Sequence, residues 1–499
     1  MKLAKACAQC RFAKRKCYSD DLRGPCLRCT ERQSPCSLTQ LTLTQSQPRL
    51  LAPSVGGIRS EESRESDILD LLDGKAEELV ENYIHKIHDR PHSLFHVPTL
   101  RADVRRGSVS KALLLGLCSM GCRFSSDAKV RSLEPDLTTE CKRLIKADLE
   151  SISLENIQAC ILAANLCAAD TNPSSEALFF PITMSQIMRL DSTEPADNTV
   201  VREVKRRVWW TLFMADRWHS SGLGLPFQIK TFPGQTDLPM DESIFHRLPA
   251  DQDGFLDVPW KPGLWAHMIT LVKIFAPIQD LNYRIVKEDL DDITAERCTM
   301  DLAHQLHVWE EILPADAQSN EENLREHQRK GTGGPFVALH LGFHHYSTLL
   351  FFQYLDTRRS PTAATRSYAE RCKYHASSYS ALLKSARSME NCDAVYLTVG
   401  HMAIVSSSVL VHTLLFGGED EVPDARNSLN ANFEALLELE QLWPALKFMV
   451  CGDYFKHSFG EHTANFLHTR LTGLSNSKTH AFCLPINTLI GWIDGWFGI

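Results

Sequence analysis

The sequence predicts a small cysteine-rich N-terminal module, a flexible linker and a large all-α domain, and three observations support this. Six cysteines fall within residues 7–36, and a stretch rich in Ser, Thr, Gln and Pro follows to about residue 66. After it, apolar residues recur every three or four positions, and strand-like alternation is scarce. The 499 residues are 43% hydrophobic and 23% charged, as in folded proteins of two or three domains. We therefore expect domains at 1–37, 38–66 and 67–499.

The six cysteines form two triplets with the same spacing: Cys, two residues, Cys, six residues, Cys. The first triplet is Cys7, Cys10 and Cys17, and the second is Cys26, Cys29 and Cys36. Structural zinc takes four thiolates, so six thiolates complete two sites only if two sulfurs bridge both metals. The repeat symmetry nominates Cys7 and Cys26 as that bridging pair. We expect two Zn²⁺ and two short helices, since a module this small cannot bury an adequate core without a staple.

Six cysteines could also form a disulfide framework or hold an iron–sulfur cluster. A disulfide framework suits small secreted domains, but no apolar leader precedes this cluster. An iron–sulfur cluster normally takes four cysteines, and duplicated triplets do not match its common ligand spacings. Both alternatives are weaker than zinc.

Positive charge is concentrated around these cysteines. Residues 1–37 carry nine Lys or Arg against three Asp or Glu, a net charge of +6, while the whole chain has a net charge of −8. Four of the nine basic residues lie between the second and third cysteines: Arg11, Lys14, Arg15 and Lys16. A basic head on an acidic body predicts a module that binds a polyanion, attached to a separate domain.

The segment "CAQCRFAKRKC", together with "GPC" before the second triplet, resembles the fungal binuclear zinc cluster transcription factors. The resemblance implies that the short helix after the second cysteine enters the DNA major groove and reads a CGG-type triplet. Lys14 matches the lysine that reads guanine, and Arg11 and Lys16 match phosphate contacts. Arg15 is grouped with them as basic, although the family varies there. Ala13 departs from the family's usual Arg or Lys, so the flanking preference stays open.

Residues 37–66 lack the sustained heptads that pair many relatives, because Gln45 and Pro48 interrupt the pattern begun by Leu38 and Leu41. We expect a flexible linker, and any homodimer would form through the helical body or on DNA.

One body segment, "REVKRRVWWTLFMADRWHSSGLGLPFQI" from Arg202 to Ile229, predicts a core helix. Its apolar stripe is Val204, Val208, Leu212 and Ala215, and Glu203 can pair with Arg207 one turn later. The segment also resembles the regulatory domain of the same family, the middle homology region. "HSLFHVPTL" before it and "LPMDES" after it resemble neighbouring segments of that domain, most clearly over 67–300. Leu225 replaces the Arg common between Gly and Pro.

Further helices are expected within the body at 110–124, 140–170, 200–218, 261–287, 296–312, 335–356, 366–389 and 428–449. The apolar segment 394–416 is long enough to span a bilayer, but it carries two histidines and several Ser and Thr, so a buried helix is favoured. Ten further cysteines stand singly in apolar segments and are expected in the core of a protein in a reducing compartment.

No enzyme motif is apparent, so no catalytic residue is expected. The histidines at 85–96, 304–307 and 344–345 form no HExxH, and "GTGGP" lacks the strand and helix of a dinucleotide site. The resemblance favours a nuclear regulator of RNA polymerase II genes that binds double-stranded DNA and contacts the transcription machinery or coactivators.

The resemblance further favours an activator of a metabolic or biosynthetic gene set that responds to a small-molecule effector. A repressor, or a regulator that acts through a partner protein, is the alternative. Segment 416–443 mixes acidic and apolar residues as activation segments do, but its helical periodicity favours packing in the body. We expect the aromatic tail 485–499 to pack in the body as well.

Overall fold

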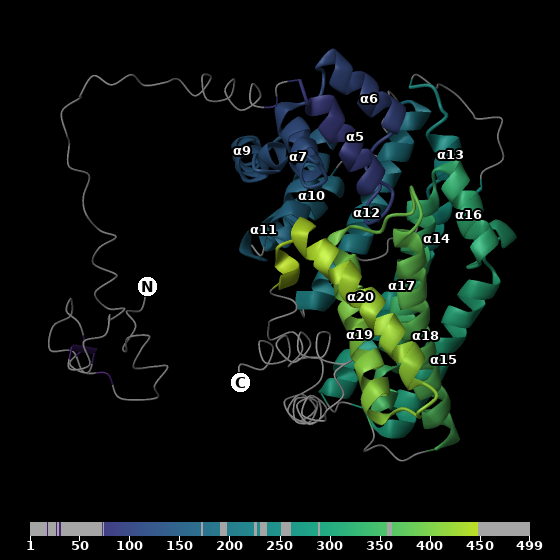
Figure 1. The fold of residues 1–499 in the computed structure, drawn as a ribbon. Helices are drawn as coiled ribbons and strands as arrows, with labels where there is room; N and C mark the ends of the chain where they lie inside the picture. Colours follow the sequence, from purple (N-terminus) through teal and green to yellow (C-terminus); the bar gives the residue numbers. More distant parts are fainter. Residues whose placement is uncertain are drawn as a thin grey trace. The chain divides into compact units, whose positions relative to one another are not determined.

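The computed structural model describes most of the predicted helical body and only a few residues of the cysteine-rich module. Residues described are 17, 26, 29–30, 72, 74–170, 173–189, 197–223, 227–229, 237–250, 261–287, 290–356 and 362–447. Internal contacts divide the chain into two units, Met1–Arg64 and Glu65–Ile499. Every regular element of the described residues in the second unit is helical, which confirms the all-α body (Figure 1).

The first group of helices precedes residue 224. It comprises α5 (Ala76–Lys86), α6 (Val97–Arg106), α7 (Lys111–Cys122), α8 (Ala128–Arg131), α9 (Glu134–Ala147), α10 (Leu154–Ala169), α11 (Pro173–Ile187) and α12 (Thr199–Leu223). Within the group, α7 packs against α5, α9 and α10, and α10 packs against α11. The helix α10 is buried on almost every side, because its residues are apolar all round rather than along one stripe.

The second group begins with the short α13 and ends with α20. It comprises α13 (Glu242–Phe245), α14 (Leu264–Val286), α15 (Asp292–Glu311), α16 (Glu321–Lys330), α17 (Gly333–Phe351), α18 (Ala363–Arg387), α19 (Leu397–Phe416) and α20 (Val422–Leu442). Two 3₁₀ turns, Ala315–Ala317 and Phe352–Leu355, lie between them. At its centre, α17 contacts α14, α15, α16, α18 and α19, and α12 meets α14 between the two groups (Figure 1).

The predicted body helices are confirmed, with two adjustments. The segment 140–170 covers parts of two helices, α9 and α10, because the chain turns at 148–153 and Ser153 starts the second helix by accepting from the Asn156 backbone N–H at 3.1 Å. The last predicted helix starts six residues early, at Val422, with Pro423 in its first turn.

The apolar helix α19 is a core helix of this domain. Its length and composition would suit a membrane span, but 67% of its most apolar window is buried inside the domain. It packs against α17, α18 and α20. The acidic–apolar segment around α20 also packs in the body, and Trp443 at its end is buried. The tail 485–499 lies outside the described residues.

Most of the scattered cysteines that the structure describes lie in the core, as expected, whereas Cys298 is half-buried. Among those described in the body, Cys118, Cys122, Cys141, Cys160, Cys372 and Cys392 are buried. Burial raises the pKa of the Cys160 thiol to about 12, which keeps this sulfur protonated at neutral pH.

Candidate functional site

The described part of the cysteine module is a helical turn. Cys29 donates its backbone N–H to the Cys26 carbonyl at 2.9 Å, and the Thr30 backbone N–H does the same at 3.1 Å. Both cysteines are buried. In a helical turn, positions i and i+3 share one face, so the two thiols point to the same side. Two thiolates on one side of a single turn fit the predicted zinc-binding role.

Among the other predicted residues of this module, Cys17 is described and half-buried. The rest lie outside the described residues. The others are the zinc ligands Cys7, Cys10 and Cys36, the base-reading Lys14 and the phosphate contacts Arg11, Arg15 and Lys16. The bridging role of Cys7 and Cys26 likewise stays a prediction.

In the helical body, the three segments singled out by sequence meet at one buried side chain, Arg207 of α12. Its Nε donates to Glu203 Oε1 at 3.0 Å, which confirms the predicted pair. Its Nη1 donates to Ser93 Oγ at 2.9 Å, and its Nη2 donates to the Met240 carbonyl at 2.6 Å. The guanidinium also lies over the Phe245 ring, 4.4 Å from its centroid. Arg207 thus ties together "HSLFHVPTL", the core helix and "LPMDES".

Glu203 and Thr211, also on α12, form further hydrogen bonds to the same two segments that Arg207 contacts. Glu203 Oε1 also accepts the Met240 backbone N–H at 2.9 Å. Thr211 exchanges two hydrogen bonds with the Ser93 backbone, both 3.2 Å. Arg207 and Glu203 are both fully buried, so each needs the other to offset the loss of hydration.

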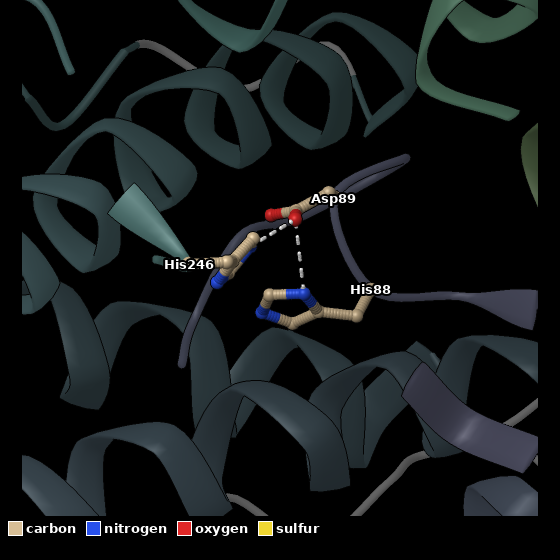
Figure 2. Close-up of side chains that lie close together, drawn as sticks. All are labelled: His88, Asp89 and His246. Carbon is tan, nitrogen blue, oxygen red and sulfur yellow. Dashed lines mark hydrogen bonds and ion pairs between the residues drawn. The ribbon is translucent and has the colours of Figure 1, made fainter. Parts of the chain in front are cut away.

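Asp89 is the second centre of this network, which we call the Arg207–Asp89 hub. It has a left-handed backbone, φ 60°, which Asp tolerates better than most residues. Its Oδ1 accepts the Ser93 hydroxyl at 2.5 Å, and its Oδ2 faces His246 Nε2 at 2.8 Å and His88 Nδ1 at 3.3 Å (Figure 2). Arg207 Nη1 lies 3.8 Å from the same carboxylate.

The tautomers of the two histidines follow from their other ring nitrogens. His88 Nε2 accepts backbone N–H groups from Leu94 at 3.2 Å and Phe95 at 3.0 Å, so the His88 proton sits on Nδ1 and points at Asp89. His246 Nδ1 accepts the Val97 N–H over a longer 3.4 Å, so its Nε2 carries the proton toward Asp89. Burial pushes the pKa of Asp89 up, but the facing imidazoles outweigh it and hold that pKa well below its usual range. Burial lowers the pKa of His88.

His88, Asp89 and His246 also have the spacing of a metal site, since their ligand atoms lie within 4.8 Å of one another. The hydrogen bonds argue against that use. A metal would need a free lone pair on each imidazole. In both histidines, one ring nitrogen already accepts a backbone N–H group, and the nitrogen that faces Asp89 carries the proton. The hub is therefore better satisfied as a hydrogen-bonded network than as a metal centre.

Glu242 closes the other side of the hub. It accepts the backbone N–H groups of Leu264 at 3.0 Å and Trp265 at 3.1 Å, the first residues of α14. Burial raises the pKa of Glu242 to about 7, against the opposing effect of Arg207, whose Nη1 is 3.9 Å away. The acidic loop "LPMDES" is thus the cap that starts α14.

A second pair in the core helix holds the chain after it. Asp216 accepts the backbone N–H groups of Gln228 and Ile229, each at 3.0 Å. Arg217 donates to the Ile229 carbonyl at 2.9 Å and lies between the rings of Phe213 and Phe227. Position 225, where Leu replaces the family's Arg, lies outside the described residues.

Residues beside the hub also contact the loop between α18 and α19. Arg90, next to Asp89, donates through Nε to the Asp393 carbonyl at 3.1 Å and through Nη1 to the His88 carbonyl at 3.3 Å. Lys86 pairs with the Asp393 carboxylate. Sequence reasoning missed Asp89, His246 and Arg90; the only local signal is their proximity to the quoted segments.

Comparison with known proteins places two family domains on this chain. The fungal Zn(2)-Cys(6) binuclear cluster domain matches residues 5–45, and the fungal specific transcription factor domain matches residues 80–328. All six predicted zinc ligands fall in the first match, and every residue of the hub falls in the second. The helices α17–α20 continue the fold beyond it.

Similar proteins carry the same description. Zn(2)-C6 fungal-type transcription factor FTF1c of Fusarium oxysporum f. sp. lycopersici is 21% identical over 75% of this chain and 44% of its own length. Zn(2)-C6 fungal-type transcription factor FTF2 of that organism is 22% identical over 75% of this chain and 38% of its own. An uncharacterized transcriptional regulatory protein of Schizosaccharomyces pombe is 23% identical over 55% and 32%. The chain thus spans less than half the length of these curated relatives. No solved structure matches it.

Proposed function

Because the chain belongs to the fungal binuclear zinc cluster transcription factors, we propose that it is a nuclear regulator that reads CGG-type triplets in duplex DNA. We further propose that it activates a metabolic or biosynthetic gene set transcribed by RNA polymerase II. The family is one of transcription regulators, and neither matched domain is catalytic. The observation that carries the proposal is the basic run between Cys10 and Cys17, inside a match to the cluster domain and ahead of a match to the regulatory domain.

The cluster domain binds two zinc ions, which supply the tetrahedral thiolate coordination that replaces a hydrophobic core. In this chain the six thiolates would come from Cys7, Cys10, Cys17, Cys26, Cys29 and Cys36. Two metals need eight ligand positions, so the proposal gives Cys7 and Cys26 a bridging role. The helical turn at 26–29 is the part of this arrangement that the structure describes.

Base reading is assigned to Lys14. A lysine that donates to guanine O6 and N7 is among the commonest specific contacts in the major groove. Arg11, Arg15 and Lys16 would contact phosphates, which raises affinity without selecting sequence and makes binding salt-dependent. The Lys14–Lys16 run is also basic enough to serve in nuclear import.

The helical body is assigned the regulatory role. Its hub joins residues 88–96, α12 and the loop before α14 by hydrogen bonds, so a displacement of one segment would disturb its hydrogen bonds to the other two. Such a rigid body can carry contacts to coactivators and to a second copy of the chain.

The proposal is tested by selecting binding sites from random duplex DNA with full-length, zinc-loaded protein. Enrichment of CGG-type triplets is expected, and Lys14→Ala should abolish it. Lys2→Ala removes the same charge from the same basic head outside the cysteine framework and should leave the selected triplet unchanged. The spacing of paired triplets would report whether the protein binds as a dimer.

The outcome that would contradict base reading is equally clear. If protein shown to contain two zinc ions enriches no sequence, or if Lys14→Ala enriches the same triplet, direct recognition is wrong. A regulator that acts through a partner protein would then be the better description. Whether it activates or represses is read separately, by fusing the body to an unrelated DNA-binding domain upstream of a reporter gene.

A further inference from the structure

A cavity of about 600 Å³ opens between the last turn of α15 and one face of α18. It lies away from the hub and shares no lining residue with it. Its lining residues are Glu310, Ser367, Glu370, Arg371, Tyr374 and His375. The five from α18 follow the i, i+3, i+4, i+7, i+8 spacing of a single helix face, so one side of α18 is turned toward the cavity.

Arg371 supplies a guanidinium to the wall of the cavity. Its carbon Cζ lies over the Phe351 ring, 4.3 Å from the ring centroid. Among the residues that the structure describes, it has no hydrogen-bond or ion-pair acceptor. Partial burial lowers the pKa of Arg371, but the group stays charged. A stacked, charged and unpaired fork of N–H donors is suited to a carboxylate ligand.

Glu310 supplies the opposite charge on the other wall. Partial burial raises the pKa of Glu310, and its carboxylate makes no ion pair within the described part of the chain. Arg371 and Glu310 therefore face the same cavity without forming a salt bridge. The third charged residue, Glu370, is already matched by Lys373 at 3.1 Å.

The rest of the lining is Ser367, Tyr374 and His375. The Phe351 ring next to Arg371 is fully buried and stacks on Tyr368, with centroids 5.4 Å apart and an interplanar angle of 13°, and neither ring is part of the lining. Burial lowers the pKa of His375 to about 3, so this imidazole carries no charge at neutral pH; its Nδ1 lies 3.1 Å from His344 Nδ1. Tyr374 is exposed beside it. The exposed Tyr374 ring offers apolar surface next to the separated charges.

We propose that this cavity binds a small zwitterion of the α-amino-acid type with an apolar or aromatic side chain. The carboxylate would accept from Arg371, the ammonium group would pair with Glu310, and the side chain would pack on the Tyr374 ring. A simple anion would be attracted by Arg371 but repelled by Glu310, and a simple cation would be attracted by Glu310 but repelled by Arg371. A zwitterion is the ligand that satisfies both charges at once.

This inference goes beyond DNA reading and is measured without DNA, so its failure would leave the proposed function untouched. Isothermal titration calorimetry of the full-length, zinc-loaded protein would use L-phenylalanine, L-tyrosine, L-tryptophan and L-leucine in turn. For L-phenylalanine, 3-phenylpropanoate lacks only the ammonium group and 2-phenylethylamine lacks only the carboxylate. At least one amino acid should bind, with an affinity at least about tenfold above that of its single-charge analogues.

Three variants locate the site. Arg371→Met keeps the length and the contact with Phe351 but removes the charge, and Glu310→Gln keeps the shape. Each should weaken amino-acid binding by about tenfold or more. Arg387→Met, on the same helix, removes a half-buried arginine paired with Glu434 and Glu438 and should leave binding unchanged.

The proposal is overturned if none of the four amino acids binds wild-type protein. It is also overturned if a single-charge analogue binds as tightly as its amino acid. Binding that survives both Arg371→Met and Glu310→Gln would place the ligand elsewhere and overturn the site.

Discussion

Two arginines of the helical body sit on phenylalanine rings at nearly the same distance, and they differ in everything else. Arg207 lies 4.4 Å from the Phe245 centroid and is fully buried, and all three of its nitrogens donate to protein acceptors. Arg371 lies 4.3 Å from the Phe351 centroid, is half-buried and faces a cavity. The aromatic contact is shared, so the hydrogen-bond partners make the difference.

The contrast separates an arginine that holds the fold from one that is available to a ligand. A buried ion pair is strongly destabilising to break, because the partner left behind is an uncompensated charge. An arginine on the wall of an open cavity has water as an alternative partner, so its removal leaves no such charge in the core. The ligand site that we propose therefore lies around Arg371, whereas the family motif lies at Arg207.

The largest expected effect is the loss of stability on replacing Arg207, measured against the same replacement at Arg371. Arg207→Met leaves Glu203 buried without its partner and should lower the free energy of unfolding by about 3–5 kcal/mol. Arg371→Met should change it by less than about 1 kcal/mol, since an exposed or half-exposed charge contributes little. Urea unfolding followed by circular dichroism gives both values. Equal losses for the two variants would remove the distinction.

Acid should weaken both regions. Burial lowers the pKa of His92 and His375 to about 3, and those of His96, His340 and His401 to about 4. These residues stay neutral when folded but protonate near pH 6.5 when unfolded, so their stabilising contribution is present above that pH and lost below it. Each should contribute about 0.7 kcal/mol of loss between pH 7 and pH 6.

Glu242 acts in the opposite direction. Its pKa of about 7 lies above that of an unfolded glutamate, so its contribution favours folding at low pH and is lost as pH rises toward 7. One such group offsets only about 1 kcal/mol over the same interval, so a net loss of about 2 kcal/mol is expected. Urea midpoints at pH 6 and pH 7 test this. A midpoint that is unchanged or higher at pH 6 would show that the histidines are not buried as neutral groups.

Asp89→Asn should have a smaller effect than Arg207→Met. Asn tolerates the left-handed backbone at this position and can still accept from one imidazole, so the loss is the charge and part of the hydrogen bonding, about 1–3 kcal/mol. Asp89→Ala should be worse by roughly 1 kcal/mol or more, because it adds backbone strain. If the two variants are equally stable, the left-handed backbone contributes nothing measurable.

The smallest expected effect is no change at all in metal content. His246→Ala removes one side of the candidate metal cluster, yet the protein should still hold two zinc ions per chain by elemental analysis. Cys26→Ala, in contrast, should lower that number. A third zinc that is lost on His246→Ala would show that the hydrogen-bond reading of the hub is wrong.

The sequence predicted what depends on neighbours along the chain. Apolar spacing located α14, α17 and α18 within a few residues, and the i,i+4 rule predicted the Glu203–Arg207 pair. It did not predict the contact between Asp89 and His246, which are 157 residues apart, because periodicity says which face is buried and not what covers it. Arg371 carried no motif, and its importance rests on partners it lacks, which only a three-dimensional structure shows. The base-reading assignment of Lys14 stays a prediction.

The most direct test of the central claim is the affinity of full-length, zinc-loaded protein for one duplex with a CGG triplet and one with that triplet changed to CAG. Fluorescence anisotropy at two salt concentrations would separate phosphate from base contacts. The account predicts tighter binding to CGG, a preference lost in Lys14→Ala and kept in Arg371→Met. Equal affinity for both duplexes in wild-type protein would contradict it.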